Sequence, residues 1–403
     1  MGFTNPFRPG AGHMPPYLAG RREEQKEFKK LLNQNIILQN LILTGLRGVG
    51  KTCLLETFKP TAIQERWLWV GADLSESASV TERTMASRVL TDLSALTSSI
   101  TIRHESSADI GFHSSTDQRP VTMNYEMLTQ FYDRTPGLAS DKLKAVLEFT
   151  WQCIKDQTRS GIIFAFDEAQ NLADHAESNQ YPLSTLLDVF QSIQKKEIPF
   201  MLALTGLPTL FPKLVEARTY SERMFRIVFL DKLQGKDILD AIQIPIQEAN
   251  CPVRFNELSV KTIAELSGGY PYFIQFICRE VYDVFIQQLD SGKDAKVPIS
   301  EIERKLDSDF FAGRWARATD RQRDLLHVAA ELENSAEEFT VAELVEKSNS
   351  MLKKPFGSSQ VNQMLSHLCD LGLVYKNRRG RYSFAVPLLD RFISRQVRGA
   401  LGG

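Results

Sequence analysis

A glycine-rich segment carries the strongest chemical signal in the sequence. Residues 45–52 read Gly-Leu-Arg-Gly-Val-Gly-Lys-Thr, a full match to the phosphate-binding pattern GxxxxGK[ST], placed after an apolar run and before a helical pattern. In such a loop, backbone N–H groups surround the phosphates, the lysine reaches the β and γ oxygens, and the hydroxyl binds Mg²⁺. The residues expected to bind nucleotide and metal are Gly45, Gly48, Val49, Gly50, Lys51, Thr52 and Cys53.

Two carboxylates follow a second apolar run. Residues 162–166 (Ile-Ile-Phe-Ala-Phe) lead directly into Asp167 and Glu168. Beside a phosphate-binding loop, one such carboxylate holds Mg²⁺ through water, and the next orients and deprotonates the attacking water. We expect the metal role for Asp167, together with Thr52, and the base role for Glu168.

A hydroxyl group ends a third apolar run. Residues 200–204 (Phe-Met-Leu-Ala-Leu) precede Thr205. In a parallel sheet this position lies at the carboxyl end of a strand, where ligands bind. We expect the Thr205 hydroxyl to hold the attacking water or to cap the following helix, and these roles are compatible.

The elements that must position these groups alternate along the chain. Short apolar runs of strand length are separated by segments with helical periodicity. The strand-like runs are 40–45, 67–70, 161–166 and 200–205, and the helical patterns are at about 50–60, 81–97, 141–158 and 183–195. Continuous apolar strands alternating with helices predict an α/β fold with a parallel sheet covered on both faces.

The remaining sequence divides the 403 residues into further parts. Residues 98–140 are rich in Ser, Thr and Asp, and we interpret them as an insertion that forms either a small hairpin or a mobile loop, with a solvated loop without function as the alternative. After residue 316, three helical patterns and a strand-turn-strand pattern predict a winged helix-turn-helix. The expected parts are a lead-in (1–20), a P-loop ATPase core (21–230), a helical lid (231–300), a linker helix (301–316) and a winged-helix domain (317–396).

Charge is nearly balanced overall but is concentrated at the C-terminus. The chain has 48 Lys+Arg against 49 Asp+Glu, whereas residues 350–403 contain nine Lys and Arg against only Asp370 and Asp390. A basic wing can contact DNA phosphates, although it can equally be a solvated face, or the domain can pack on the ATPase as a regulatory element. The candidate DNA contacts are Lys376, Arg378, Arg379 and Arg381.

These motifs resemble those of AAA+ and STAND-type ATPases, in particular the origin-recognition-like branch with a C-terminal winged helix. The resemblance covers about residues 15–392 and includes Tyr17-Leu-Ala-Gly20-Arg21 before the P-loop and Gly269-Tyr-Pro271 in the lid. It implies that Gly20 and Arg21 flank the adenine, that Thr205 is the sensor residue of the fourth strand, and that Pro271 contacts the nucleotide. No arginine accompanies Pro271, so slow hydrolysis is expected.

The same resemblance implies an arginine finger after the fourth strand. Arg218, Arg223 and Arg226 are the candidates, and Arg223 matches the family pattern of Glu-Arg-hydrophobic-Phe best. Such a guanidinium pairs with the γ-phosphate within one chain or across a subunit interface, and a salt-bridging surface arginine is the alternative.

The sequence thus predicts an ATP- and Mg²⁺-dependent switch that hydrolyses ATP slowly, assembles as a homo-oligomer in the ATP state and binds double-stranded DNA. The alternative is a signalling or defence ATPase that activates an effector protein without DNA. A third hypothesis, an ATPase that binds nucleotide only structurally, conflicts with the intact Lys51, Asp167 and Glu168.

Five widely spaced cysteines without a CxxC pair and the lack of an 18-residue apolar run favour a cytoplasmic protein without membrane contact. The string Asp-Glu-Ala-Gln at 167–170 is shared with helicases, but no other helicase motif accompanies it.

Overall fold

The computed structural model describes residues 3–102, 121–157, 160–249, 251–290, 296–335, 337–378 and 380–401. The chain forms two compact units. The sheet unit comprises residues 22–44 and 54–229, and the lid unit comprises residues 1–21, 45–53 and 230–403. The P-loop therefore belongs to the lid unit, although the strand before it belongs to the sheet unit.

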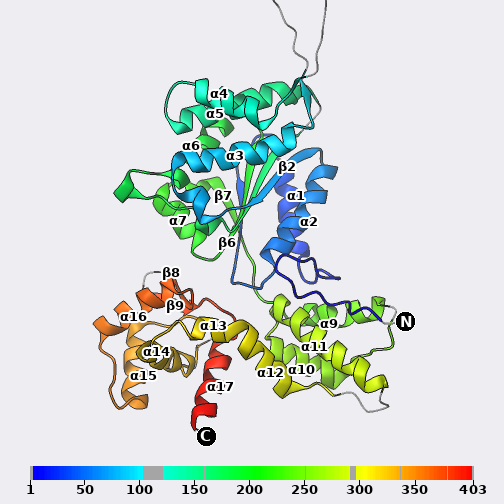
Figure 1. Ribbon diagram of the computed structural model, residues 1–403, viewed down its shortest axis with the longest axis vertical. Helices are drawn as coiled ribbons and strands as arrows, with labels where there is room; N and C mark the ends of the chain where they lie inside the picture. Colours follow the sequence, from blue (N-terminus) through cyan, green and yellow to red (C-terminus); the bar gives the residue numbers. More distant parts are fainter. Residues whose placement is uncertain are drawn as a thin grey trace, which may run out of the picture. The chain divides into compact units, whose positions relative to one another are not determined.

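A five-stranded sheet forms the centre of the sheet unit, with the strand order β2-β5-β6-β1-β7 (Figure 1). All neighbouring strands pair in parallel, as the continuous apolar runs of β1, β2, β5 and β6 predicted, and β7 adds a strand that was not predicted. Every residue of β1, β5 and β6 is buried, whereas the edge strand β7 exposes Ile227 and Phe229. The strands are β1 (Asn40–Thr44), β2 (Trp67–Asp73), β5 (Gly161–Asp167), β6 (Phe200–Gly206) and β7 (Phe225–Phe229).

Helices cover both faces of this sheet (Figure 1). On one face Phe28 of α1 (Arg22–Leu32) stacks on Phe58 of α2 (Lys51–Gln64), with ring centroids 4.2 Å apart. The other face is buried in one hydrophobic core with the remaining helices. These are α3 (Glu82–Thr97), α4 (Tyr125–Arg134), α5 (Ala139–Ile154), α6 (Pro182–Gln194), α7 (Leu210–Ala217) and α8 (Ser221–Met224).

The segment expected as an insertion contains regular structure at its ends. Strands β3 (Thr101–Ile102) and β4 (Val121–Thr122) pair antiparallel, and α4 follows with the side chain of Asn124 accepting from the N–H of Met127. The hairpin alternative therefore holds for the described ends of the segment, while residues 103–120 lie outside the described residues.

The lid unit continues with helices. The segment expected as a helical lid contains α9 (Lys236–Glu248), α10 (Glu257–Ser267) and α11 (Pro271–Asp290). A linker follows, with α12 (Ile299–Leu306), the π-helical turn η5 (Asp307–Phe311) and α13 (Ala312–Trp315). No helix in the described part of the chain is long and apolar enough to cross a membrane.

The C-terminal region has the elements of a winged helix-turn-helix in their expected order. Capping boxes at Thr319 and Thr340 start the first two helices, and Phe339 adds a bridge to Tyr382 beside the hairpin. The region shares one hydrophobic core with the lid. Its elements are α14 (Asp320–Ala330), α15 (Val341–Met351), α16 (Ser358–Asp370), β8 (Val374–Arg378), β9 (Arg381–Phe384) and α17 (Leu389–Leu401).

Candidate nucleotide-binding site

The P-loop occupies its predicted place between β1 and α2. Gly48 and Gly50 have φ values of 78° and 91°, in the left-handed region where a side chain is strained. A Cβ on Gly45 would lie 2.3 Å from the carbonyl oxygen of Leu230, so only glycine fits there. The Lys51 ammonium donates to the carbonyls of Gly45 and Leu46, both at 3.0 Å. The loop thus presents a cation within a glycine-built turn, which is the chemistry that phosphate groups require.

Arg21 fixes the P-loop from a distant part of the sequence. Its side chain is only 6% exposed, and Nη2 donates to the carbonyl of Val49 at 2.9 Å and to that of Asp231 at 2.7 Å. Sequence reasoning missed this positioning role because neither carbonyl carries a sequence signal. The contact with adenine that the resemblance implied stays a prediction.

The lead-in segment docks on the lid. Phe7 is buried and stacks on Phe255, and the amide of Asn5 donates to the carbonyl of Arg279 on α11 at 3.0 Å. Further along, the carbonyl of His13 accepts from the Cys53 thiol at 3.3 Å. The segment therefore runs from α11 to the residues that directly follow the P-loop.

Gly20 stands where this segment meets α9. It has φ 63°, and an added Cβ would lie 2.8 Å from the carboxyl group of Asp237. A side chain at this position would therefore be strained and would collide with α9.

The lid turn touches the P-loop directly. Gly268 and Gly269, both with positive φ, end α10, and Pro271 starts α11. The backbone N–H of Tyr272, the residue after Pro271, donates to the carbonyl of Gly48 at 3.0 Å. A change in the P-loop backbone must therefore act on the first turn of α11.

The predicted carboxylates lie at the carboxyl end of β5 in the sheet unit. Asp167 is 6% exposed and its Oδ1 accepts from the N–H of Glu168 at 2.8 Å. Glu168 is exposed, adopts a left-handed conformation with φ 51°, and its carboxylate accepts from the amide of Gln170. Gln170 Oε1 in turn accepts from the N–H of Leu207 at 3.1 Å, so the loop after β6 fixes the orientation of Glu168. Sequence reasoning did not single out Gln170.

Thr205 lies on β6 and is fully buried. Its hydroxyl donates to the carbonyl of Phe166 on β5 at 3.2 Å. The following helix α7 begins at Leu210 with Thr209 at its N-cap, so the structure does not support a capping role for Thr205. The role in holding water stays a prediction.

The three arginine-finger candidates have different partners. Arg218 pairs with Asp188 at 2.6 Å, and the Tyr220 hydroxyl donates to the same carboxylate at 2.7 Å. Burial raises the pKa of Asp188, but these hydrogen bonds outweigh it and hold that pKa below its ordinary value. Arg226 pairs with Glu27 at 2.9 Å.

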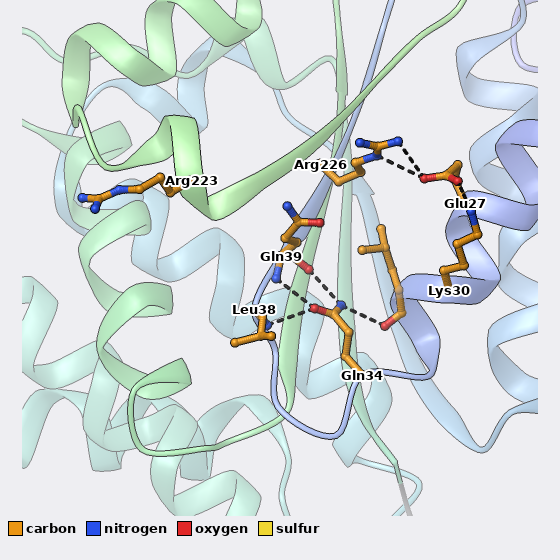
Figure 2. Close-up of a pocket in the computed structure, with 8 residues that line it drawn as sticks. Glu27, Lys30, Gln34, Leu38, Gln39, Arg223 and Arg226 are labelled. Carbon is orange, nitrogen blue, oxygen red and sulfur yellow. Dashed lines mark hydrogen bonds and ion pairs between the residues drawn. The ribbon is translucent and has the colours of Figure 1, made fainter.

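Arg223 differs from the other two candidates. It is exposed on α8, makes no ion pair among the described residues, and points away from Arg226 and Glu27 (Figure 2). These side chains line an open cavity of about 600 Å³ in the sheet unit. Of the three arginines, Arg223 is therefore the one whose guanidinium is available to a further partner.

The candidate DNA contacts lie around the β8–β9 hairpin. Lys376 is exposed and Arg381 is half-buried, while Arg379 and the side chain of Arg378 lie outside the described residues. On α16 the side chains of Gln360, Asn362 and Gln363 are exposed. A basic hairpin thus accompanies a polar helix face. Where the structure describes the chain, it contains no cluster of three or more His, Cys, Asp or Glu side chains that could hold a metal ion.

Comparison with known proteins places the fold. Residues 308–393 match a family described as Domain of unknown function (DUF8462), and no curated protein matches the sequence. The structure is similar to the Walker-type ATPase PABY2304 of Pyrococcus abyssi, with 16% identity, a TM-score of 0.58, and coverage of 94% of this chain and 96% of that one. It is also similar to the Aeropyrum pernix ORC2 protein in ADPNP–ADP complexes, with 15% identity, a TM-score of 0.53, and coverage of 98% of both chains. The chain therefore shares the fold of these two proteins along nearly its whole length.

Proposed function

We propose that this protein is an ATP-driven switch that binds ATP with Mg²⁺, hydrolyses it slowly and changes the state of its C-terminal region. The observation that carries the proposal is the hydrogen bond from the N–H of Tyr272 to the carbonyl of Gly48. This hydrogen bond joins the loop that would hold the phosphates to the first turn of α11. A nucleotide bound in the loop would therefore act directly on the lid.

The chain's own residues divide the chemistry. Lys51 and the loop N–H groups hold the phosphates, Thr52 and Asp167 provide oxygens for the metal, and Mg²⁺ would supply charge neutralisation between the β- and γ-phosphates. Glu168, oriented by Gln170, accepts the proton of the attacking water. Thr205 lies on the neighbouring strand to help hold that water. Arg223 is available to a nucleotide in a neighbouring copy, in a homo-oligomer of the ATP state.

Contacts within the lid unit support coupling from the lid turn to the C-terminal region. Arg391 of α17 donates to the carbonyl of Glu265 at 2.6 Å, and a Cβ on Gly268 would lie 2.8 Å from Leu388. Tyr270 lies in the same turn, where burial and the charges of Asp231 and Asp390 raise its pKa to about 12. The turn that contacts the P-loop therefore also contacts α17.

The output that we propose first is DNA binding through α16 and the β8–β9 hairpin. The support is chemical, because exposed amide side chains on a helix suit base edges, and the cations of the hairpin suit backbone phosphates. The alternative output is activation of an effector protein. The docking of α17 on the lid turn is consistent with it, since an internal switch of this kind needs no DNA.

The test is ATP turnover by the full chain with and without duplex DNA across a salt series. Lys51→Ala is expected to abolish nucleotide binding, and Glu168→Gln to retain ATP and trap the assembled state. If both variants hydrolyse ATP like the parent protein, the site is misassigned.

A wing variant separates the two outputs. Lys376→Ala combined with Arg381→Ala, compared with Lys26→Ala on the exposed face of α1 in the sheet unit, is expected to lose DNA stimulation while keeping basal turnover. Stimulation that falls with salt and disappears in the wing variant supports DNA coupling. If ATP turnover by the parent protein is the same with and without DNA, the effector hypothesis is favoured.

A further inference from the structure

A cluster of three arginines lies beside the P-loop in the lid unit. Arg47 is the third residue of the loop, Arg314 belongs to α13, and Arg317 follows that helix. Arg47 and Arg317 are exposed and Arg314 is half-buried. Within the described ranges, none of these guanidinium groups forms an ion pair with a carboxylate. Most arginines of the linker and C-terminal region that approach the interior do have such partners, for example Arg395 with Asp307.

A short chain of contacts connects Arg314 with the P-loop. Its Nη1 donates to the carbonyl of Phe310 at 3.0 Å, and its guanidinium carbon lies 5.2 Å from the centre of the Phe310 ring. The Phe310 ring is 5.4 Å from the ring of Tyr272, whose backbone N–H donates to Gly48, the neighbour of Arg47. Arg314 is thus connected to the loop backbone at the residue next to Arg47, and the charge of Arg47 acts on the Arg314 guanidinium.

The positive charges on this edge repel one another. Burial, followed by the positive charges of Arg47 and Arg317, lowers the pKa of the Arg314 guanidinium. An arginine in this setting stays protonated, so the repulsion between these like charges lowers the stability of the folded state. An anion bound between the guanidinium groups would remove that cost.

We infer that Arg47 and Arg314 bind the terminal phosphate of a nucleoside triphosphate and thereby distinguish ATP from ADP. This inference rests on the proposed function and deepens it by assigning the nucleotide discrimination to two residues. The loop N–H groups and Lys51 contact phosphates that both nucleotides possess. Cations at the outer edge of the loop gain energy only when a further phosphate is present, which is the differential affinity that a switch needs.

The position of Arg314 provides a route to the C-terminal region. It follows the π-helical turn Asp307–Phe311, a helical irregularity that often accompanies functional sites. Phe311 in that turn stacks on Phe392 of α17, with ring centroids 5.1 Å apart. A pull on Arg314 by the phosphate therefore acts on α17 through a rigid aromatic contact.

The test compares affinities for Mg²⁺·ATPγS and Mg²⁺·ADP by calorimetry in the full chain. The variants are Arg314→Gln and Arg47→Ala, with Arg304→Ala, an exposed arginine of α12 in the same continuous helical segment, as the matched control. Each of the first two is expected to weaken ATPγS binding at least about tenfold and to change ADP binding less than about twofold. The control is expected to change neither affinity. Arg47 is exposed, so its variant tests the inference even if Arg314→Gln loses stability.

The other outcomes overturn the inference in distinguishable ways. Equal weakening of both nucleotides would give Arg314 a purely structural role in supporting Tyr272. A parental ratio of the two affinities in both variants would refute the terminal-phosphate site while leaving the proposed function intact. A loss of DNA affinity alone would assign the cluster to nucleic acid. If the parent protein binds neither nucleotide, or Lys51→Ala binds both like the parent, the proposed function fails and the inference fails with it.

Discussion

Replacing Arg21 by methionine tests whether this side chain holds the P-loop in place. Two hydrogen bonds from its guanidinium reach the carbonyls of Val49 and Asp231, and the side chain is only 6% exposed. A hydrogen bond from a charged group contributes about 1.5–3 kcal/mol, and methionine keeps the apolar part of the side chain. We therefore expect the opening of the loop to become easier by about 3 kcal/mol, at the lower end of the sum for the pair.

The assay is amide hydrogen exchange over Gly45–Cys53, because it reads local opening without requiring unfolding of both units. At about 1.4 kcal/mol per factor of ten, the expected acceleration is on the order of 100-fold. Mg²⁺·ATPγS at about 100 times its dissociation constant should stabilise the closed loop of the variant against exchange by about 2.7 kcal/mol, provided that the loop still binds the nucleotide. Arg22→Met is the matched control, since Arg22 is the adjacent exposed arginine. Identical exchange in both variants and the parent would refute the positioning role of Arg21.

Three further predictions concern other contacts. The pKa of Asp188 is lowered in the folded state, so its ionised carboxylate stabilises the fold above the ordinary pKa and loses this effect as the pH falls through the folded value. Urea unfolding between about pH 6 and pH 3 should show this loss of stability. Asp188→Asn should make the stability less dependent on pH. Phe392→Ala, which removes a 1% exposed ring from Phe311 and Trp315, should cost about 3–5 kcal/mol in denaturant unfolding, whereas Phe3→Ala, at 53% exposed, should cost little. Gln170→Ala frees the Glu168 carboxylate and should lower kcat about tenfold with little change in KM; an unchanged kcat would contradict the positioning of Glu168.

The parts of the fold that could be predicted are those whose causes are local in the sequence. The P-loop lies between β1 and α2 because its glycines, lysine and hydroxyl are consecutive residues whose backbone geometry depends on residue type. Asp167 lies at the end of β5 because seven consecutive residues fill a strand buried on both faces.

The features that were missed depend on packing between distant residues. Strand β7 was missed because it is a half-exposed edge strand whose charged and apolar residues do not form a continuous apolar run. Helix α4 was missed because the polar composition of residues 98–140 hid the buried side chains of Leu128 and Tyr132. The π-helical turn has no sequence signature at all, since it accommodates the packing of Phe310 and Phe311 against Phe273.

The residues that support the P-loop explain why the loop belongs to the lid unit. Arg21 holds Val49, the carbonyl of Leu230 allows only glycine at position 45, and the N–H of Tyr272 holds Gly48. Arg21 precedes the loop in the sequence, whereas Leu230 and Tyr272 follow it by more than 170 positions, and each of the three restrains a different point of the same short loop. A ligand that tightens the loop must therefore act on the lead-in, the start of the lid and α11 together. Such a response requires only small displacements of the loop, because each contact is a direct hydrogen bond or van der Waals contact.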